Sequence, residues 1–235
     1  MALSVIIMAY REAENLAILL PDIIDNANKA TDDFEILVID SPNSNDNTKE
    51  ICEKFGVRYI LQEKPSYAGA FQTGVKYASK DVFLMMDADF SHPPKIIPEL
   101  YNTFVGEKYD VGIGSRYVNG GISDDLKRNK VFSKVLNFVY RKMFGLENIG
   151  DISSGYKMYL TQMLKDMRIM SKFFEVHIEI LVKLKLAKAN LKIIEIPINF
   201  QKRLKGVSKR NYLTFLPQFG ILLIRLFLYK LFYKN

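Results

Sequence analysis

The segment Val82-Phe83-Leu84-Met85-Met86-Asp87-Ala88-Asp89 is an apolar run that ends in two carboxylates. The run predicts a buried strand, and acids at i and i+2, released from its end, can converge on one hard cation. Mg²⁺ and Mn²⁺ take carboxylate and phosphate oxygens, and ligands of open α/β sheets gather at the carboxyl ends of strands. A lone Asp-x-Asp is common in surface turns and caps, but the buried strand before it and Pro93-Pro94 after it favour a site for a metal-bound diphosphate.

The rest of the first 117 residues alternates strand and helix patterns around this segment. The strand patterns are continuous apolar runs, as expected for parallel strands that are covered on both faces. The sequence therefore predicts an α/β fold, with a mostly parallel sheet built from right-handed βαβ units and flanked by helices. Predicted strands are Leu3–Ala9, Phe34–Asp40, Arg58–Gln62, Val82–Asp87 and Tyr109–Ser115, and predicted helices are Glu12–Asn28, Asn47–Phe55, Ala68–Ala78 and Lys95–Glu107.

The pattern changes after Tyr117. Lys127–Phe144 predicts an amphipathic helix, because apolar residues recur at helical spacing opposite a basic side. The apolar residues are Val131, Val135, Phe138 and Val139. Around this helix we expect a loop over Val118–Asp125, strands over Gly155–Leu160 and Leu191–Phe200, and a helix over Phe173–Leu186.

Composition and charge limit the class of protein. The chain has 235 residues, 49% of them hydrophobic, and a single cysteine, which excludes a disordered chain and an intrachain disulfide framework. Residues 183–235 hold 12 lysines and arginines and one acid, Glu195, so residues 1–182 carry a net charge of −4 within the total of +7. A basic end segment indicates nucleic acid, lipid head groups or phosphates as partners. The apolar stretch Leu213–Tyr233 within it favours a membrane surface and no nucleic acid.

Leu213–Tyr233 has 21 residues, about enough to cross a bilayer. Pro217, Gln218, Arg225 and Lys230 interrupt it, and a charge at mid-span is unfavourable. We therefore prefer a helix or helix pair in the membrane interface over a spanning helix; the third possibility is a final helix packed on the core.

Further polar residues follow other predicted strands. Asp40 suits a nucleotide ribose or base, although its loop is also rich in turn formers. Arg116 suits a phosphate or a surface salt bridge. His92 suits a phosphate contact or a structural role, and His177 is interpreted as a packed histidine. The basic segment from Arg203 to Arg210 suits an anion arriving from the membrane side, or a solvated loop.

Several segments together resemble the family-2 inverting glycosyltransferases, in particular dolichyl-phosphate mannose synthases and their polyprenyl-phosphate relatives. The resemblance is collinear over about residues 3–210 and includes an Asp-Ala-Asp-x-x-His-Pro element and a late Arg-x-x-Gly-x-Ser-Lys element. The segments that carry it are Tyr10-Arg11-Glu12-Ala13-Glu14-Asn15, Asp87-Ala88-Asp89-Phe90-Ser91-His92-Pro93, Gly114-Ser115-Arg116-Tyr117, Asp151-Ile152-Ser153-Ser154-Gly155-Tyr156-Lys157-Met158-Tyr159 and the stretch 200–209.

This resemblance implies a GT-A type fold over residues 1–210, with a nucleotide-sugar half (1–117) and an acceptor half (118–210), followed by a membrane-associating helical tail (211–235). It implies Mg²⁺ or Mn²⁺ on Asp87 and Asp89, with Ser91 contributing. The implied catalytic residues are Asp89, Arg116 and Arg203. The nucleotide sugar would contact Tyr10, Glu12, Asp40, Asp87 and Ala88. The lipid phosphate would contact Ser133, Arg203, Ser208 and Lys209, together with Arg128 or Lys130, between which an insertion leaves the choice open.

The chain departs from the family pattern around the donor pocket. Ser66-Tyr67-Ala68 replaces the usual glycines, Lys157 replaces an arginine, Met8 replaces a proline, and a single Asp40 replaces a pair of acids. These departures leave the donor's identity open more than the reaction class.

The resemblance implies transfer of a hexose from a nucleotide sugar, GDP-mannose or a UDP-sugar, to a polyprenyl or dolichyl phosphate at the cytoplasmic face of a membrane, by a peripheral or tail-anchored enzyme. A phosphate acceptor needs no general base, whereas a saccharide hydroxyl does, and Asp151 is the candidate for that role. A glycosyltransferase acting on a saccharide hydroxyl and a non-catalytic, membrane-bound nucleotide-sugar-binding protein are the alternatives.

Overall fold

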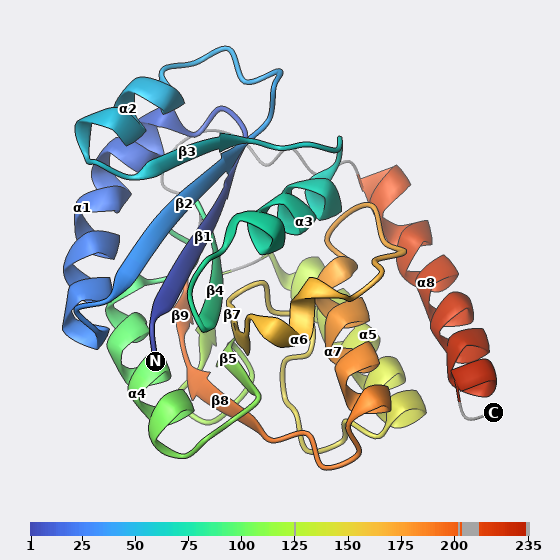
Figure 1. Cartoon of the computed structure of the whole chain (residues 1–235). Helices are drawn as coiled ribbons and strands as arrows, with labels where there is room; N and C mark the ends of the chain where they lie inside the picture. Colours follow the sequence, from blue (N-terminus) through green and yellow to red (C-terminus); the bar gives the residue numbers. More distant parts are fainter. Residues whose placement is uncertain (125, 202, 204–211, 234–235) are drawn as a thin grey trace.

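The computed structural model of the protein describes residues 1–124, 126–201, 203 and 212–233. Its centre is a seven-stranded sheet in the order β3-β2-β1-β4-β7-β5-β8, with helices on both faces (Figure 1). A second sheet pairs β6 with β9. The strands are β1 (Leu3–Ala9), β2 (Phe34–Asp40), β3 (Arg58–Leu61), β4 (Val82–Asp87), β5 (Val111–Ser115), β6 (Ile122–Ser123), β7 (Lys157–Leu160), β8 (Ile193–Pro197) and β9 (Asn199–Phe200).

The helices lie close to the predicted positions, and one additional short helix, α6, follows β7. The helices are α1 (Ala13–Ala30), α2 (Thr48–Lys54), α3 (Tyr67–Tyr77), α4 (Ile97–Gly106, after a 3₁₀ turn at Pro94–Ile96), α5 (Lys127–Phe144), α6 (Gln162–Lys165), α7 (Val176–Ala187) and α8 (Tyr212–Tyr233). The prediction of a mostly parallel sheet flanked by helices is confirmed.

The central strands are buried on both faces, which explains their unbroken apolar sequences. Every residue of β1 is buried. Its Leu3, Val5 and Ile7 pack with α1 and α4, whereas Ile6 and Met8 pack on the other side of the sheet with residues of α3, α5, α7 and α8. Each strand thus contributes alternate side chains to two hydrophobic cores.

Strand β7 is the exception to the parallel order. It lies between β4 and β5 and is antiparallel to both. Because its direction is reversed, its amino end lies at the same edge of the sheet as the carboxyl ends of β4 and β5. The loop that leads into β7 therefore reaches that edge.

The strand predicted over Leu191–Phe200 is divided in two. β8 pairs with β5 as far as Pro197, and the chain then changes partner, so that β9 pairs with β6. A proline has no backbone N–H to donate to a ladder, and the partner changes at this residue. Ile122–Ser123, expected to be loop, becomes β6 through this pairing.

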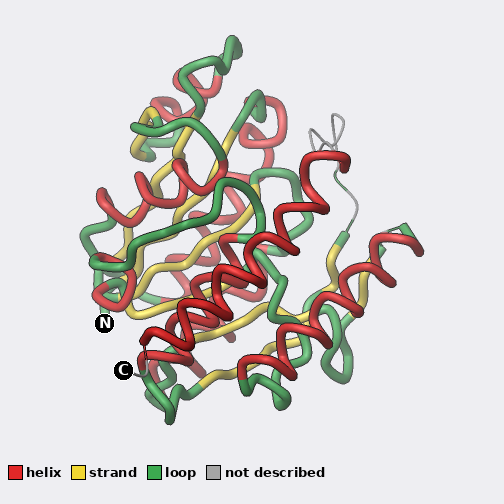
Figure 2. The backbone as a smooth tube through the Cα atoms, turned by 90° about the vertical axis from the view of Figure 1, so that its right-hand side faces the viewer, coloured by secondary structure: helices red, strands yellow, loops and turns green. Residues whose placement is uncertain are grey.

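Helix α8 packs on the core along the outside of the molecule (Figure 2). Phe219, Leu222 and Leu226 are buried, and the Tyr140 hydroxyl on α5 donates a hydrogen bond to the Phe219 carbonyl oxygen, 2.5 Å away. This is the arrangement named above as the third possibility for the tail. Among the described residues, no helix combines the length and apolarity that a membrane span requires.

Candidate functional site

The candidate site lies at the edge of the sheet where the parallel strands have their carboxyl ends. Tyr10 follows β1, Asp40 ends β2, Asp87 ends β4 and Arg116 follows β5. The reversed β7 adds the loop 151–156 to the same edge. The topology therefore brings together residues that are far apart in the sequence.

Two short local structures orient the acidic pair. The backbone N–H of Asp87 donates to Nδ1 of His92 over 2.9 Å, and His92 is buried and stacked on Tyr156. Asp89 accepts hydrogen bonds from the Ser91 backbone N–H at 3.1 Å and from its hydroxyl at 2.6 Å. Phe90 has a φ of 69°, so the backbone directly after Asp89 turns through the left-handed region.

Arg203 closes this side of the site. Its guanidinium donates to Glu12 at 2.6 Å and pairs with Asp89 at 2.9 Å. Burial raises the pKa of Asp89, but the Ser91 hydrogen bonds and the charge of Arg203 outweigh it, and the net pKa is lowered. The structure thus places Arg203 beside two residues expected on the donor side, Glu12 and Asp89.

Arg116 is held at a second position, deeper under α5. Its guanidinium forms a two-pronged ion pair with Asp151, with distances of 2.7 and 2.8 Å, and also contacts Ser153 at 3.0 Å and Ser133 at 3.4 Å. Burial raises the pKa of the Asp151 carboxyl, but Arg116 more than offsets this and the net pKa is lowered. Asp151 is fully buried, so it orients Arg116 and is a poor general base for a saccharide hydroxyl.

Two residues that support this loop were not predicted from the sequence. The Glu195 carboxylate accepts from the backbone N–H groups of Gly150 (2.6 Å) and Asp151 (2.9 Å). The Lys157 ammonium donates to the carbonyl oxygens of Ile152 and Ser154, and burial lowers its pKa to about 7. Glu195 carried one signal: it is the single acid in the basic segment 183–235.

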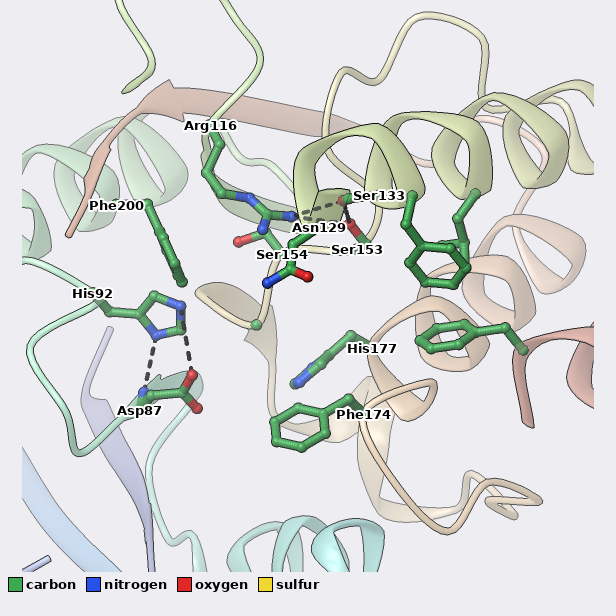
Figure 3. Close-up of a pocket in the computed structure, with 14 residues that line it drawn as sticks. Asp87, His92, Arg116, Asn129, Ser133, Ser153, Ser154, Phe174, His177 and Phe200 are labelled. Atoms are coloured by element: carbon green, nitrogen blue, oxygen red, sulfur yellow. Dashed lines mark hydrogen bonds and ion pairs between the residues drawn. The ribbon is translucent and has the colours of Figure 1, made fainter. Parts of the chain in front are cut away.

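A pocket of about 90 Å³ joins these groups (Figure 3). Its polar end contains Asp87, His92, Arg116, Ser133 and Ser153, and the Phe200 ring lies there against His92 and Arg116. Its apolar end consists of Phe132 and Leu136 from α5, Phe219 from α8 and Phe174 before α7. His177, interpreted from the sequence as a packed histidine, is indeed buried but also lines this pocket.

The remaining predicted residues lie in different surroundings. Asp40 is buried, accepts from the Ser41 backbone N–H (2.8 Å) and the Tyr59 hydroxyl (3.2 Å), and has its pKa raised by burial. Tyr10 is exposed, whereas Ala88 is buried. Arg128 and Lys130 lie in the first turn of α5, where Asn129 between them lines the pocket. Ser208 and Lys209 lie outside the described residues.

The acidic pair fits a cation that is shared with a substrate. No cluster of three or more His, Cys, Asp or Glu side chains suited to a metal occurs in the described part of the chain. Mg²⁺ is usually bound by one or two carboxylates together with substrate phosphates and water. Asp87 and Asp89, with the hydroxyl of Ser91, match that kind of site and do not match an all-protein metal cage.

Solved structures share this fold. Glucosyl-3-phosphoglycerate synthase from Mycobacterium tuberculosis, in complex with Mn²⁺, uridine diphosphate and phosphoglyceric acid, superposes with a TM-score of 0.73 at 17% identity, covering 97% of this chain and 78% of that one. The same enzyme with Mg²⁺ and uridine diphosphate gives 0.71 at 18% identity, covering 97% of this chain and 79% of that one. The GT-A type fold is thereby confirmed.

Sequence comparison gives the family. Dolichol-phosphate mannosyltransferase of Pyrococcus furiosus is 35% identical over 89% of this chain, which spans 59% of that protein's length. Polyprenol monophosphomannose synthase of Mycolicibacterium smegmatis is 32% identical over 88% of this chain and 80% of its own length. Residues 4–168 match the family model described as glycosyl transferase family 2. The chain belongs to glycosyl transferase family 2.

Proposed function

We propose that this protein transfers a hexose from a nucleotide sugar to a polyprenyl phosphate at a membrane surface. One observation carries the acceptor class: the pocket combines the Arg116 guanidinium and the hydroxyl groups of Ser133 and Ser153 with apolar side chains from α5, α8 and the segment before α7. A lipid phosphate likewise consists of an anionic head and an apolar chain. Its head would meet Arg116, Ser133 and Ser153, and its first isoprene units would meet Phe132 and Phe219.

The protonation chemistry favours a phosphate acceptor over a hydroxyl. A phosphate oxygen is already anionic at neutral pH and can attack the sugar C1 without a general base. The base candidate Asp151 is fully buried and paired with Arg116 through both carboxylate oxygens. A saccharide hydroxyl would therefore not find its proton acceptor in Asp151.

For the donor, we propose that Tyr10, Glu12, Asp40 and Ala88 contact the nucleotide. GDP-mannose is favoured over a UDP-sugar because the two relatives are named for mannosyl transfer or mannose synthesis. A divalent cation supplies positive charge to the leaving diphosphate. Asp87 and Asp89 would hold it, while Arg203 and Arg116 add fixed positive charge next to the reacting phosphates.

A donor and acceptor screen tests this proposal. Full-length protein is incubated with radiolabelled GDP-mannose, UDP-glucose or UDP-galactose, with Mn²⁺, and with a short polyprenyl phosphate, the matching polyprenol or a disaccharide. Incorporation of label into the polyprenyl phosphate alone is the expected result. Transfer to the polyprenol or the disaccharide would contradict the acceptor class, and nucleotide binding without transfer would favour the non-catalytic alternative.

Two exposed apolar helix faces are proposed to rest on the membrane. On α5, Val131, Val135 and Phe138 recur at helical spacing and are each more than half exposed. On α8, Ile224, Leu228 and Leu231 also recur at helical spacing, with exposed fractions of 63%, 46% and 51%. Lysines such as Lys134 and Lys142 on α5 are exposed as well. Apolar and basic side chains on adjoining helices suit the interface of an anionic bilayer. The protein would then associate with the membrane peripherally.

Substitution tests this surface better than deletion, because α8 also supplies Phe219, Leu222 and Leu226 to the core. We expect the triple variant Ile224→Ser/Leu228→Ser/Leu231→Ser to bind phosphatidylglycerol-containing vesicles at least about tenfold less well in co-sedimentation, since apolar burial is lost. The control is Ile18→Ser/Leu61→Ser, which changes exposed apolar residues on α1 and β3. Equal losses in the variant and the control would contradict a membrane role for α8.

A further inference from the structure

Tyr67 links one of the two acidic residues to a helix on the far side of the pocket. Its hydroxyl donates to Oδ1 of Asp87 over 3.3 Å and lies 2.9 Å from Nε2 of His177. Tyr67 begins α3, Asp87 ends β4 and His177 lies in the first turn of α7. Three separate elements thus meet at one hydroxyl group.

The donors and acceptors available on Asp87, Tyr67 and His177 determine the direction of these hydrogen bonds. A carboxylate can only accept, so both contacts are hydrogen bonds only when the single hydroxyl hydrogen of Tyr67 points to Asp87. The Tyr67 oxygen is then the acceptor for His177, which donates from Nε2. The order is His177 Nε2–H to Tyr67, and Tyr67 O–H to Asp87 Oδ1.

The Tyr67 ring is also fixed by packing. It lies against Phe174, with ring centroids 4.0 Å apart, and edge-on to His177, with centroids 5.4 Å apart. The Ala68 backbone N–H bonds to the Lys172 carbonyl oxygen (3.1 Å), which ties the start of α3 to the segment before α7. The hydroxyl is therefore held in place from both sides and is not a mobile surface group.

The sequence around this contact is one of the chain's departures from the family pattern. Where the resemblance implies glycines, this chain has Ser66-Tyr67-Ala68. A glycine has no side chain with which to reach Asp87. The contact is thus a property of this chain's own residues.

We infer that Tyr67 and His177 are positioning residues that orient the Asp87 carboxylate for its cation. Outer partners of a metal-binding carboxylate fix its direction, and removing one typically weakens metal affinity or activity about 10–100-fold. With Oδ1 bound by Tyr67, the other oxygen, Oδ2, which lies 4.0 Å from Nε2 of His92, is the oxygen left for the cation. This inference rests on the proposed metal-dependent transfer.

Mn²⁺ affinity is the decisive measurement. The dissociation constant is obtained by EPR of free Mn²⁺, with saturating GDP or UDP, whichever the wild-type protein binds. We expect Tyr67→Phe, which keeps the ring and removes only the hydroxyl, to weaken Mn²⁺ binding about 10–100-fold. Its transfer rate should recover largely at saturating Mn²⁺. The matched control is Tyr77→Phe, which removes an exposed hydroxyl bonded to Glu63 and should bind Mn²⁺ as the wild type does.

Two variants at His177 test the direction of the hydrogen bond between His177 and Tyr67. His177→Gln retains an N–H donor and should stay within about threefold of wild type, whereas His177→Leu should weaken Mn²⁺ binding as Tyr67→Phe does. Wild-type Mn²⁺ affinity in Tyr67→Phe, or a normal His177→Leu beside a defective His177→Gln, would overturn the inference. If the wild-type protein binds no Mn²⁺ with either nucleotide, the proposed metal-dependent function fails instead, so the two failures are distinguishable.

Discussion

Asp89→Ala is expected to lower transfer by at least about a thousandfold, roughly 4 kcal/mol of transition-state stabilisation. Asp89 is one of only two carboxylates at the end of β4 and its following turn, so its removal halves the anionic ligand set for a cation. The substitution also releases Arg203, which pairs with Asp89 at 2.9 Å. Initial rates at several Mn²⁺ concentrations measure the effect.

The fold should survive this change, because Asp89 lies in the turn after β4 and contributes nothing to the two hydrophobic cores. Circular dichroism and thermal unfolding of the variant provide the check. Ser91→Ala is the graded control: it removes one hydrogen bond to Asp89 and should lower the rate far less. Full activity of Asp89→Ala, or wild-type turnover that persists in EDTA, would exclude Asp89 as a cation ligand.

Arg203→Ala is expected to lower transfer about a hundredfold or more, roughly 3 kcal/mol. The guanidinium neutralises Glu12 and Asp89, and its loss leaves two neighbouring carboxylates where phosphates must bind. Arg203→Lys retains the charge but loses the two-pronged contact, so a smaller loss is expected. Steady-state kinetics with donor and lipid varied separately measure both variants.

The kinetic constants also assign the partner of Arg203. A raised KM for lipid with unchanged nucleotide binding would assign Arg203 to the acceptor phosphate, as the family resemblance implies. Weakened donor binding with an unchanged lipid KM would assign it to the diphosphate, and the case for the acceptor would then rest on Arg116. Arg225→Ala is the matched control, because Arg225 is an exposed arginine on α8 that bonds to the Met170 carbonyl oxygen.

The sequence by itself determined the fold class and the edge of the sheet at which the site lies. β1, β2 and β4 have the bounds that were predicted. A strand covered on both faces must be apolar throughout, so its burial can be predicted from its local sequence. Asp87 follows from the same logic, because the first polar residue after such a strand must lie at its end.

Only the tertiary structure decided what each polar side chain contacts. The direction of β7 depends on β4 and β5, which lie far away in the chain. An apolar run indicates that a strand is covered on both faces, but it does not give the direction of this one strand. That reversal brings Asp151 to Arg116, 35 residues apart. Arg203 reaches Glu12 across 191 residues, and Tyr67 reaches His177 across 110. Helical and strand periodicity act over a few residues, whereas these pairings result from how the whole chain packs. The sequence alone therefore allowed Asp151 to be interpreted as a base and His177 as a core residue, because their partners, Arg116 and Tyr67, are brought to them only by the fold.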